Sequence, residues 1–162
     1  MSNTQQSNYA FIDAQNLYLS VQLQNWKLDY RKLRKYLTDK YNVEVAYLFI
    51  GYIQANNDVY QSLQKAGFVL IFKEALHIGK LIKGNCDGEM ILQAMIDYND
   101  YNKAVIVTGD GDFACLIKYL YQKQKLETVM VPNSQKYSVL IKKTAKEKIT
   151  SISDIKNKLE TK

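Results

Sequence analysis

Short apolar runs rich in β-branched and aromatic residues alternate along this chain with segments whose apolar residues recur every three or four positions. The apolar runs predict strands at 9–12, 43–53, 68–72, 104–107 and 128–131. Strands that alternate with helices form a parallel sheet covered on both faces, because each parallel connection needs a crossover. The pattern therefore predicts an α/β fold, a three-layer α/β/α Rossmann-like domain with a mainly parallel sheet of about five strands.

The segments between the strands have helical periodicity, with one exception. The region 77–86 contains two glycines and predicts a loop. We expect helices over residues 17–23, 30–37, 58–66, 88–98, 113–121 and 137–145, and a short final helix over 154–159.

Length and composition favour one domain. A chain of 162 residues suits a single domain of ~150 residues, and its one proline leaves no room for a long Pro-rich linker. We expect a flexible N-terminus at 1–8, one domain at 9–148 and a basic C-terminal extension at 149–162. Two isolated cysteines make neither a zinc ribbon nor a disulfide scaffold. No apolar stretch approaches the ~20 residues of a membrane span, so we expect a cytoplasmic protein with no membrane contact.

The chain is basic, with 22 Lys and Arg against 16 Asp and Glu and a formal net charge of +6. Residues 142–162 hold seven lysines and three acids, a net charge of +4. Such an excess favours a polyanionic partner. A solvated lysine-rich tail explains the same excess, and charge alone leaves both interpretations open.

Acidic residues stand where predicted strands end or helices begin. Asp13 follows the first strand, Asp110 and Asp112 follow the strand at 104–107, and Asp87 opens a helix. Open parallel sheets bind ligands outside the carboxyl ends of their strands. If these ends meet, four carboxylates share one pocket.

In such a pocket, like charges a few ångströms apart either raise one another's pKa values or require a cation. Oxygen ligands suit Mg²⁺ or Mn²⁺. Apart from Cys86, no His or Cys lies beside the acids, which argues against zinc. A divalent metal beside a basic surface indicates phosphodiester chemistry, in which the metal ionises a water and neutralises phosphate charge.

Each acid also has a structural interpretation. Asp13, Asp87 and Asp112 could cap helices, and Asp110 could serve a Gly-Asp-Gly turn. These interpretations weaken together, because all four acids fall at strand exits or helix starts.

Three polar residues near the acids have open roles. Asn16 could orient a water or a phosphate oxygen, or simply face solvent. Thr108 could donate to Asp110 or to a ligand, or merely end its strand. Lys83 could contact a phosphate, although it is one lysine among twenty.

Three segments of the chain resemble the NYN family, a branch of the PIN-like nuclease superfamily. They are residues 11–17, 83–87 and 107–113, of which the third is the most specific. Their order and approximate spacing agree with the family from about Tyr9 to about Pro132. Many relatives have one residue between the Lys-Gly pair and the following acid, whereas this chain has two.

The resemblance implies a PIN-like α/β fold, an acidic Mg²⁺ or Mn²⁺ site and ribonuclease activity. It assigns the acidic site to Asp13, Asp87, Asp110 and Asp112, with Asn16 and Thr108 assisting. The expected function is hydrolysis of RNA phosphodiester bonds at a four-carboxylate metal site. An alternative is an RNA-binding module of the same fold that does not cleave.

Two other α/β classes fit less well. A response-regulator-like domain needs an acidic phosphoacceptor after a central strand, but the middle strands end in 53–54 and 72–73 without one. A haloacid-dehalogenase-type phosphatase needs a second aspartate at position 15, which is Gln15.

The expected partner is RNA, with a second copy of the chain or an accessory protein as a candidate source of specificity. An acidic pocket repels phosphates, so a nuclease of this kind needs positive surface nearby. We assign RNA-backbone contacts to the C-terminal lysines, which are Lys142, Lys143, Lys146 and Lys148.

Overall fold

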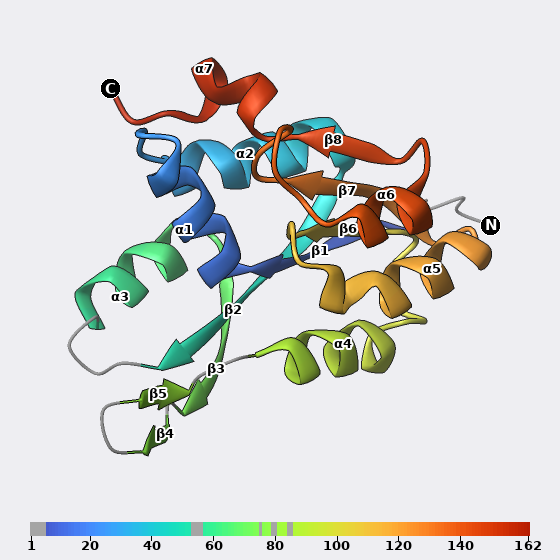
Figure 1. Cartoon of the computed structure of the whole chain (residues 1–162), viewed down its shortest axis with the longest axis horizontal. Coiled ribbons are helices and arrows are strands. Elements are labelled where there is room, and N and C mark those ends of the chain that lie inside the picture. Colours follow the sequence, from blue (N-terminus) through green and yellow to red (C-terminus); the bar gives the residue numbers. More distant parts are fainter. Residues whose placement is uncertain (1–5, 53–56, 75, 79–80, 84–85) are drawn as a thin grey trace.

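The computed structural model describes residues 6–52, 57–74, 76–78, 81–83 and 86–162. A six-stranded parallel sheet crosses the molecule in the order β3-β2-β1-β6-β7-β8 (Figure 1). Its strands are β1 Asn8–Asp13, β2 Val43–Tyr52, β3 Val69–Glu74, β6 Ala104–Val107, β7 Leu126–Val131 and β8 Ile149–Ser151. The α/β class and the parallel sheet predicted from the sequence are confirmed, with one strand more than expected.

Helices connect the strands and cover both faces of the sheet. They are α1 Ala14–Leu23, α2 Tyr30–Tyr41, α3 Asn57–Lys65, α4 Asp87–Ile96, α5 Ala114–Gln122, α6 Val139–Ala145 and α7 Lys156–Leu159, with 3₁₀ turns η2 Gly111–Phe113 and η3 Ser153–Ile155. None of the helices described has both the length and the apolar character of a membrane span.

Two hydrophobic cores lie on opposite faces of the sheet. The α1–α3 and α7 side chains pack in one core, and those of α4, α5 and α6 pack in the other. Strand β6 shows the division, because Val105 and Val107 point into the first core while Ala104 and Ile106 point into the second. All four are fully buried, which explains why this strand is continuously apolar in sequence.

Two regions differ from the sequence-based expectations. The loop expected over 77–86 contains β4 Leu76–Ile78 and β5 Leu81–Lys83, which pair antiparallel, so the loop prediction was wrong there. The two strands have only three residues each, so their apolar pattern was too short to outweigh the loop signal of the glycines in this region.

The segment expected as a C-terminal extension contributes β8 and α7 to the domain. Strand β8 pairs with β7, and Ile152 and Leu159 are fully buried. A three-residue strand carries too little pattern to be predicted. At the other end, β1 begins at Asn8, and residues 1–5 of the expected flexible N-terminus lie outside the described part.

Candidate active site

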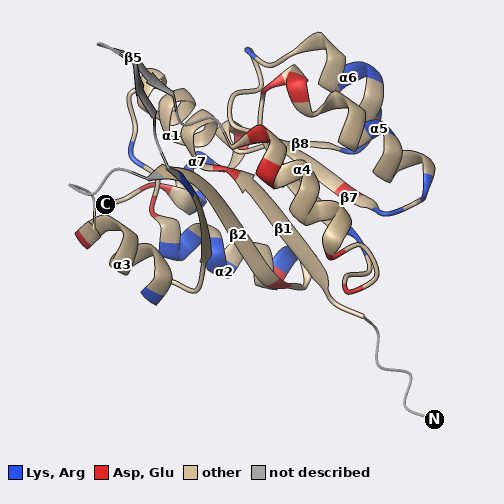
Figure 2. Ribbon diagram, turned by 90° about the horizontal axis from the view of Figure 1, so that it is seen from below, with Lys and Arg blue, Asp and Glu red and all other residues tan. Residues whose placement is uncertain are grey.

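The order in which strands are added to the sheet changes direction between β1 and β6. From β1 it builds outward through β2 to β3, and it then returns by way of α4 to β6 on the other side of β1. A crevice opens at such a switch point, outside the carboxyl ends of the strands. Acidic residues gather there, around the end of β1 and the start of α4 (Figure 2).

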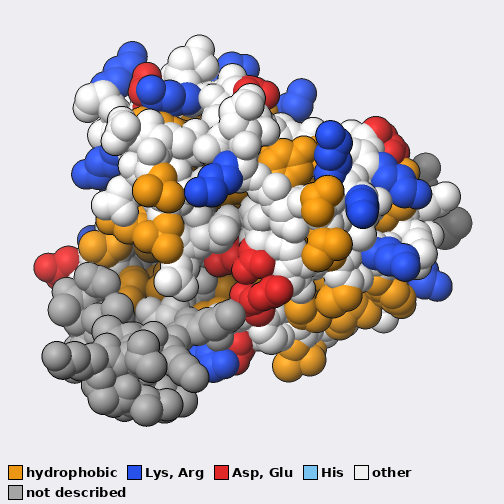
Figure 3. Space-filling view, viewed as in Figure 1, with side chains coloured by type: hydrophobic (Ala, Val, Ile, Leu, Met, Phe, Trp, Pro, Cys, Tyr) orange, Lys and Arg blue, Asp and Glu red, His pale blue; other side chains and the backbone are white. Residues whose placement is uncertain are grey.

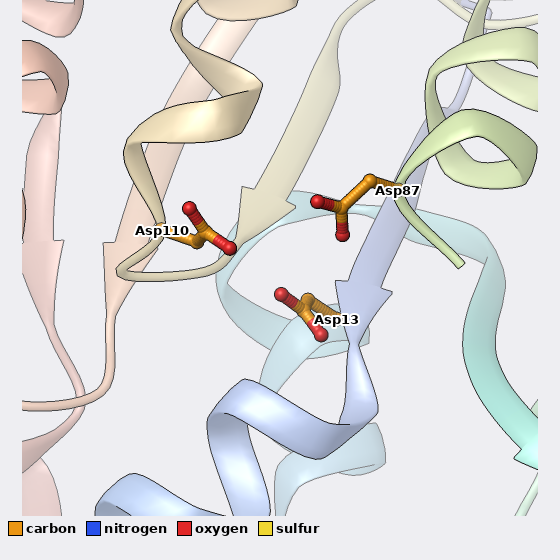
Figure 4. Close-up of side chains that lie close together, drawn as sticks. All are labelled: Asp13, Asp87 and Asp110. Carbon is orange, nitrogen blue, oxygen red and sulfur yellow. The ribbon is translucent and has the colours of Figure 1, made fainter. Parts of the chain in front are cut away.

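Three aspartates converge at this point. Asp13 ends β1, Asp110 follows β6, and Asp87 is the first residue of α4. Each offers a carboxylate oxygen, and these oxygens lie within 4.8 Å of one another. The three side chains point toward a common centre (Figure 4). The structure thus brings together three of the four acids that the sequence singled out.

Two polar residues hold the β6 exit against the start of α1. The Thr108 side chain is fully buried, and its hydroxyl donates to Asp13 Oδ2 at 3.1 Å and accepts from the Asp110 N–H at 3.1 Å. Asn16 Oδ1 accepts from the Gly109 N–H at 2.8 Å. Thr108 and Asn16 therefore fix the relative positions of the acids.

The structural interpretations also hold for two of the acids, helix capping for Asp13 and turn formation for Asp110, whereas Asp112 is not the N-cap of η2 or α5. Asp13 Oδ1 accepts from the Asn16 N–H at 3.3 Å and caps α1. Asp110 Oδ1 accepts from the Asp112 N–H at 2.9 Å and caps η2. Each carboxylate has a second oxygen, so capping and cluster membership are compatible. Asp87 has a different position, because Cys86 is the N-cap of α4 and Asp87 lies in its first turn.

Burial dominates the electrostatics of Asp13 and raises its pKa to about 6. The hydrogen bonds from Asn16 and Thr108 lower the pKa, and the nearby charges of Asp87 and Asp110 raise it. Ionising a carboxyl group in this position costs free energy, and a bound cation would offset that cost.

The donor set of this cluster fits a hard divalent cation. Carboxylate oxygens suit Mg²⁺ and Mn²⁺, both of which bind through one or more carboxylates. Burial raises the pKa of the neighbouring Cys86 thiol to about 11, with the charge of Glu89 adding to the effect. The thiol therefore stays protonated near neutral pH, which leaves an oxygen-only site.

Asp112 lies outside the group of three among the residues that the structure describes. It belongs to the η2 turn, and its side chain is exposed. Asp110 precedes the η2 turn and Asp112 lies within it, so membership of one motif does not place both carboxylates at one centre. As a fourth site residue, Asp112 remains a prediction.

The basic residues predicted to bind RNA either do not line the crevice or have side chains outside the described part of the structure. Lys83 is in β5, but its side chain lies outside the described part. Lys142 and Lys143 occupy the last turn of α6, and Lys146 Nζ lies 5.0 Å from the centre of the Tyr121 ring. Of the C-terminal lysines, none lines the crevice in the described part of the chain.

A cavity of about 670 Å³ opens over Asp13, Asp87 and Asp110. Acidic side chains mark its position at the middle of the face in Figure 3, with hydrophobic side chains on both sides. Its walls include Gln15, Asn16, Leu19, Ser20 and Leu23 from α1, and Gln135, Lys136, Tyr137 and Ser138 from the loop after β7. Sequence reasoning missed the β7–α6 loop, although the rule that directed attention to residues after β1 and β6 applies equally after β7.

Comparison with known proteins places this geometry in a family. The chain is 26% identical over 131 residues to the low amplitude and bright protein LabA of Synechococcus elongatus, covering 74% of this chain and 70% of LabA. The crystal structure of a protein of unknown function from Vibrio parahaemolyticus has the same fold, with a TM-score of 0.81 at 20% identity and 99% of each chain covered. The NYN domain model matches residues 9–152. Because this match spans nearly the whole chain, the protein belongs to the NYN domain family and has its nuclease-like fold.

Proposed function

We propose that this protein is a metal-dependent ribonuclease that hydrolyses RNA phosphodiester bonds. The observation that carries the proposal is the convergence of Asp13, Asp87 and Asp110, with oxygens within 4.8 Å of one another, at the switch point of an NYN domain. These three carboxylates would hold Mg²⁺ or Mn²⁺. The bound metal would supply an ionised water at neutral pH and neutralise charge on the scissile phosphate.

The remaining polar residues have supporting roles in this proposal. Thr108 orients Asp13 and the backbone of Asp110, and Asn16 fixes the turn at Gly109, so the acids are held before substrate arrives. Such preorganisation matters because catalytic groups act only within a narrow range of geometry. We keep Asp112 as a proposed fourth acid, and the C-terminal lysines as proposed sequence-independent contacts to the RNA backbone.

A cleavage assay with purified protein tests the function. RNA and DNA of mixed sequence are incubated with Mg²⁺, Mn²⁺ or EDTA, and the products are resolved on a gel. We expect RNA cleavage that requires the metal and is lost in Asp110→Asn. The control is Asp154→Asn, which changes an exposed acid on η3 and should cleave like the wild type.

A binding titration with the same RNAs, run beside the cleavage assay, separates cleavage from binding alone. Intact RNA under every metal condition, together with retained RNA binding, would contradict the ribonuclease and favour the non-catalytic RNA-binding module. Cleavage that persists in EDTA would contradict the metal dependence.

A further inference from the structure

The cavity over the three aspartates has two further walls of contrasting chemistry. Helix α1 forms one wall, and the β7–α6 loop forms the other. Gln24, the C-cap of α1, donates from Nε2 to the carbonyl of Pro132, which follows β7, at 3.1 Å. The acids, the helix wall and the loop wall therefore surround one space.

The helix wall presents an apolar strip that the protein core does not use. Leu17 and Val21 point into the core, whereas Leu19 is 45% exposed and Leu23 is 74% exposed. Residues four apart share a face of a helix, so Leu19 and Leu23 form one strip along the cavity. Exposed leucines lining a cavity beside polar groups are typical of a surface that receives an apolar or aromatic ligand group.

The loop wall presents one cation. Lys136 is the single basic residue that lines the cavity in the described part of the chain, and its side chain is exposed. Hydrogen bonds within the loop hold its backbone. The Gln135 N–H donates to Asn133 Oδ1 at 2.9 Å, and the Lys136 N–H donates to the Asn133 carbonyl at 3.2 Å. Ser138 N–H donates to the Gly109 carbonyl at 3.1 Å, which ties the loop to the acidic centre.

We propose that this cavity is a subsite for one nucleotide unit, in which Lys136 contacts the phosphate next to the scissile one and the Leu19–Leu23 strip packs against an unpaired base. This inference rests on the proposed function. A phosphate near three carboxylates needs a compensating cation, and Lys136 supplies it from the loop wall. A base that lies flat on leucines must be free of its complement, so the subsite selects unpaired nucleotides. A volume of about 670 Å³ accommodates such a unit.

Binding measurements test the base contact. Single-stranded RNA octamers carrying a fluorophore are titrated in EDTA and in Ca²⁺, with RNA integrity checked on a gel. We expect Leu19→Ser/Leu23→Ser to weaken binding about tenfold, because the apolar contact with the base is lost. An octamer that is abasic at every position should bind the variant and the wild type equally, because no register places a base on the leucines. The control Leu92→Ser/Ile96→Ser removes a comparable exposed pair on α4, away from the cavity, and should bind like the wild type.

The salt dependence of binding tests the phosphate contact. Lys136→Gln should reduce the slope of log affinity against log salt by ~0.7, the value for one phosphate contact on a single strand. Lys158→Gln, an exposed lysine on α7, should leave the slope unchanged. A Lys136→Gln slope equal to that of the wild type would overturn the assignment of Lys136.

The outcomes distinguish this subsite from the proposed function. Suppose that the wild type cleaves RNA. If the leucine variant then binds RNA with normal affinity, or loses affinity for base-containing and abasic octamers to the same extent, the subsite is wrong and the ribonuclease stands. If nothing is cleaved but the expected binding losses occur, the subsite stands and the ribonuclease is wrong. Failure of the wild type to bind any octamer in either buffer would contradict the subsite.

Discussion

Replacing Asp13 with asparagine should stabilise the metal-free protein at alkaline pH and destabilise it at acidic pH. Burial raises the pKa of Asp13 to about 6 in the folded state, against 3.8 in an unfolded chain. The protonated carboxyl therefore contributes stability that is fully present below about pH 3.8 and is lost as the pH rises through 6. Asparagine cannot ionise and avoids this loss.

The structure sets the size of the effect. A pKa raised from 3.8 to about 6 corresponds to roughly 3 kcal/mol of unfolding free energy lost by the wild type above pH 7. The amide keeps one carbonyl acceptor for the Asn16 N–H, but its NH2 group cannot accept the hydrogen bond from the Thr108 hydroxyl, and this loss costs about 1 kcal/mol. Asp13→Asn should therefore gain about 2 kcal/mol at pH 8 and lose about 1 kcal/mol at pH 4.

Urea unfolding in EDTA at pH 4 and at pH 8 measures both differences. For a chain of this length, 2 kcal/mol corresponds to about 4–8 °C in Tm, so a thermal scan gives a second reading. Asp154→Asn is the control and should shift stability by less than ~0.5 kcal/mol at either pH. If Asp13→Asn destabilises the protein equally at both pH values, Asp13 ionises without strain and the electrostatic argument is wrong.

Three further predictions address the metal, the support of the acids and the basic surface. Adding Mn²⁺ should raise the Tm of the wild type by mass action, and Asp110→Asn should remove most of that rise; an unchanged rise would move the metal elsewhere. Thr108→Val leaves the Asp110 N–H without its acceptor, so urea unfolding should show a loss of about 1–3 kcal/mol, and a neutral result would refute the bridging role. Changing all four C-terminal lysines to Gln should flatten the salt dependence of RNA binding by up to about three units with turnover at saturating RNA preserved. An unchanged slope would identify these lysines as a solvated surface.

The parts of this site that follow strand ends were predictable from sequence. Asp13 directly follows the buried apolar residues of β1, and Asp110 stands three residues after the end of β6. A parallel sheet brings such strand ends to one edge, so adjacency in space followed from the strand pattern. Asp87 was recognisable because it opens a helix whose apolar face was clear. Local rules sufficed here, since each residue is fixed by the element next to it.

Other features depend on contacts between distant segments and could not be predicted. Asp112 belongs to the same sequence motif as Asp110, but the direction of its side chain depends on the η2 turn. The position of Lys136 beside the acids depends on the bond between Ser138 and Gly109, which no periodicity encodes. Strand β8 joins the sheet because β7 presents a free edge, and its own three residues give no signal.

The dependence of the RNA cleavage rate on Mn²⁺ concentration tests the three-acid metal site most directly. The wild type, Asp87→Asn and Asp154→Asn are compared at saturating RNA after exhaustive treatment with chelator. The account predicts no cleavage without metal, a saturating rise for the wild type and Asp154→Asn, and a rate lower by several orders of magnitude for Asp87→Asn at every Mn²⁺ concentration. A folded Asp87→Asn protein that cleaves RNA with the wild-type rate and Mn²⁺ dependence would contradict it.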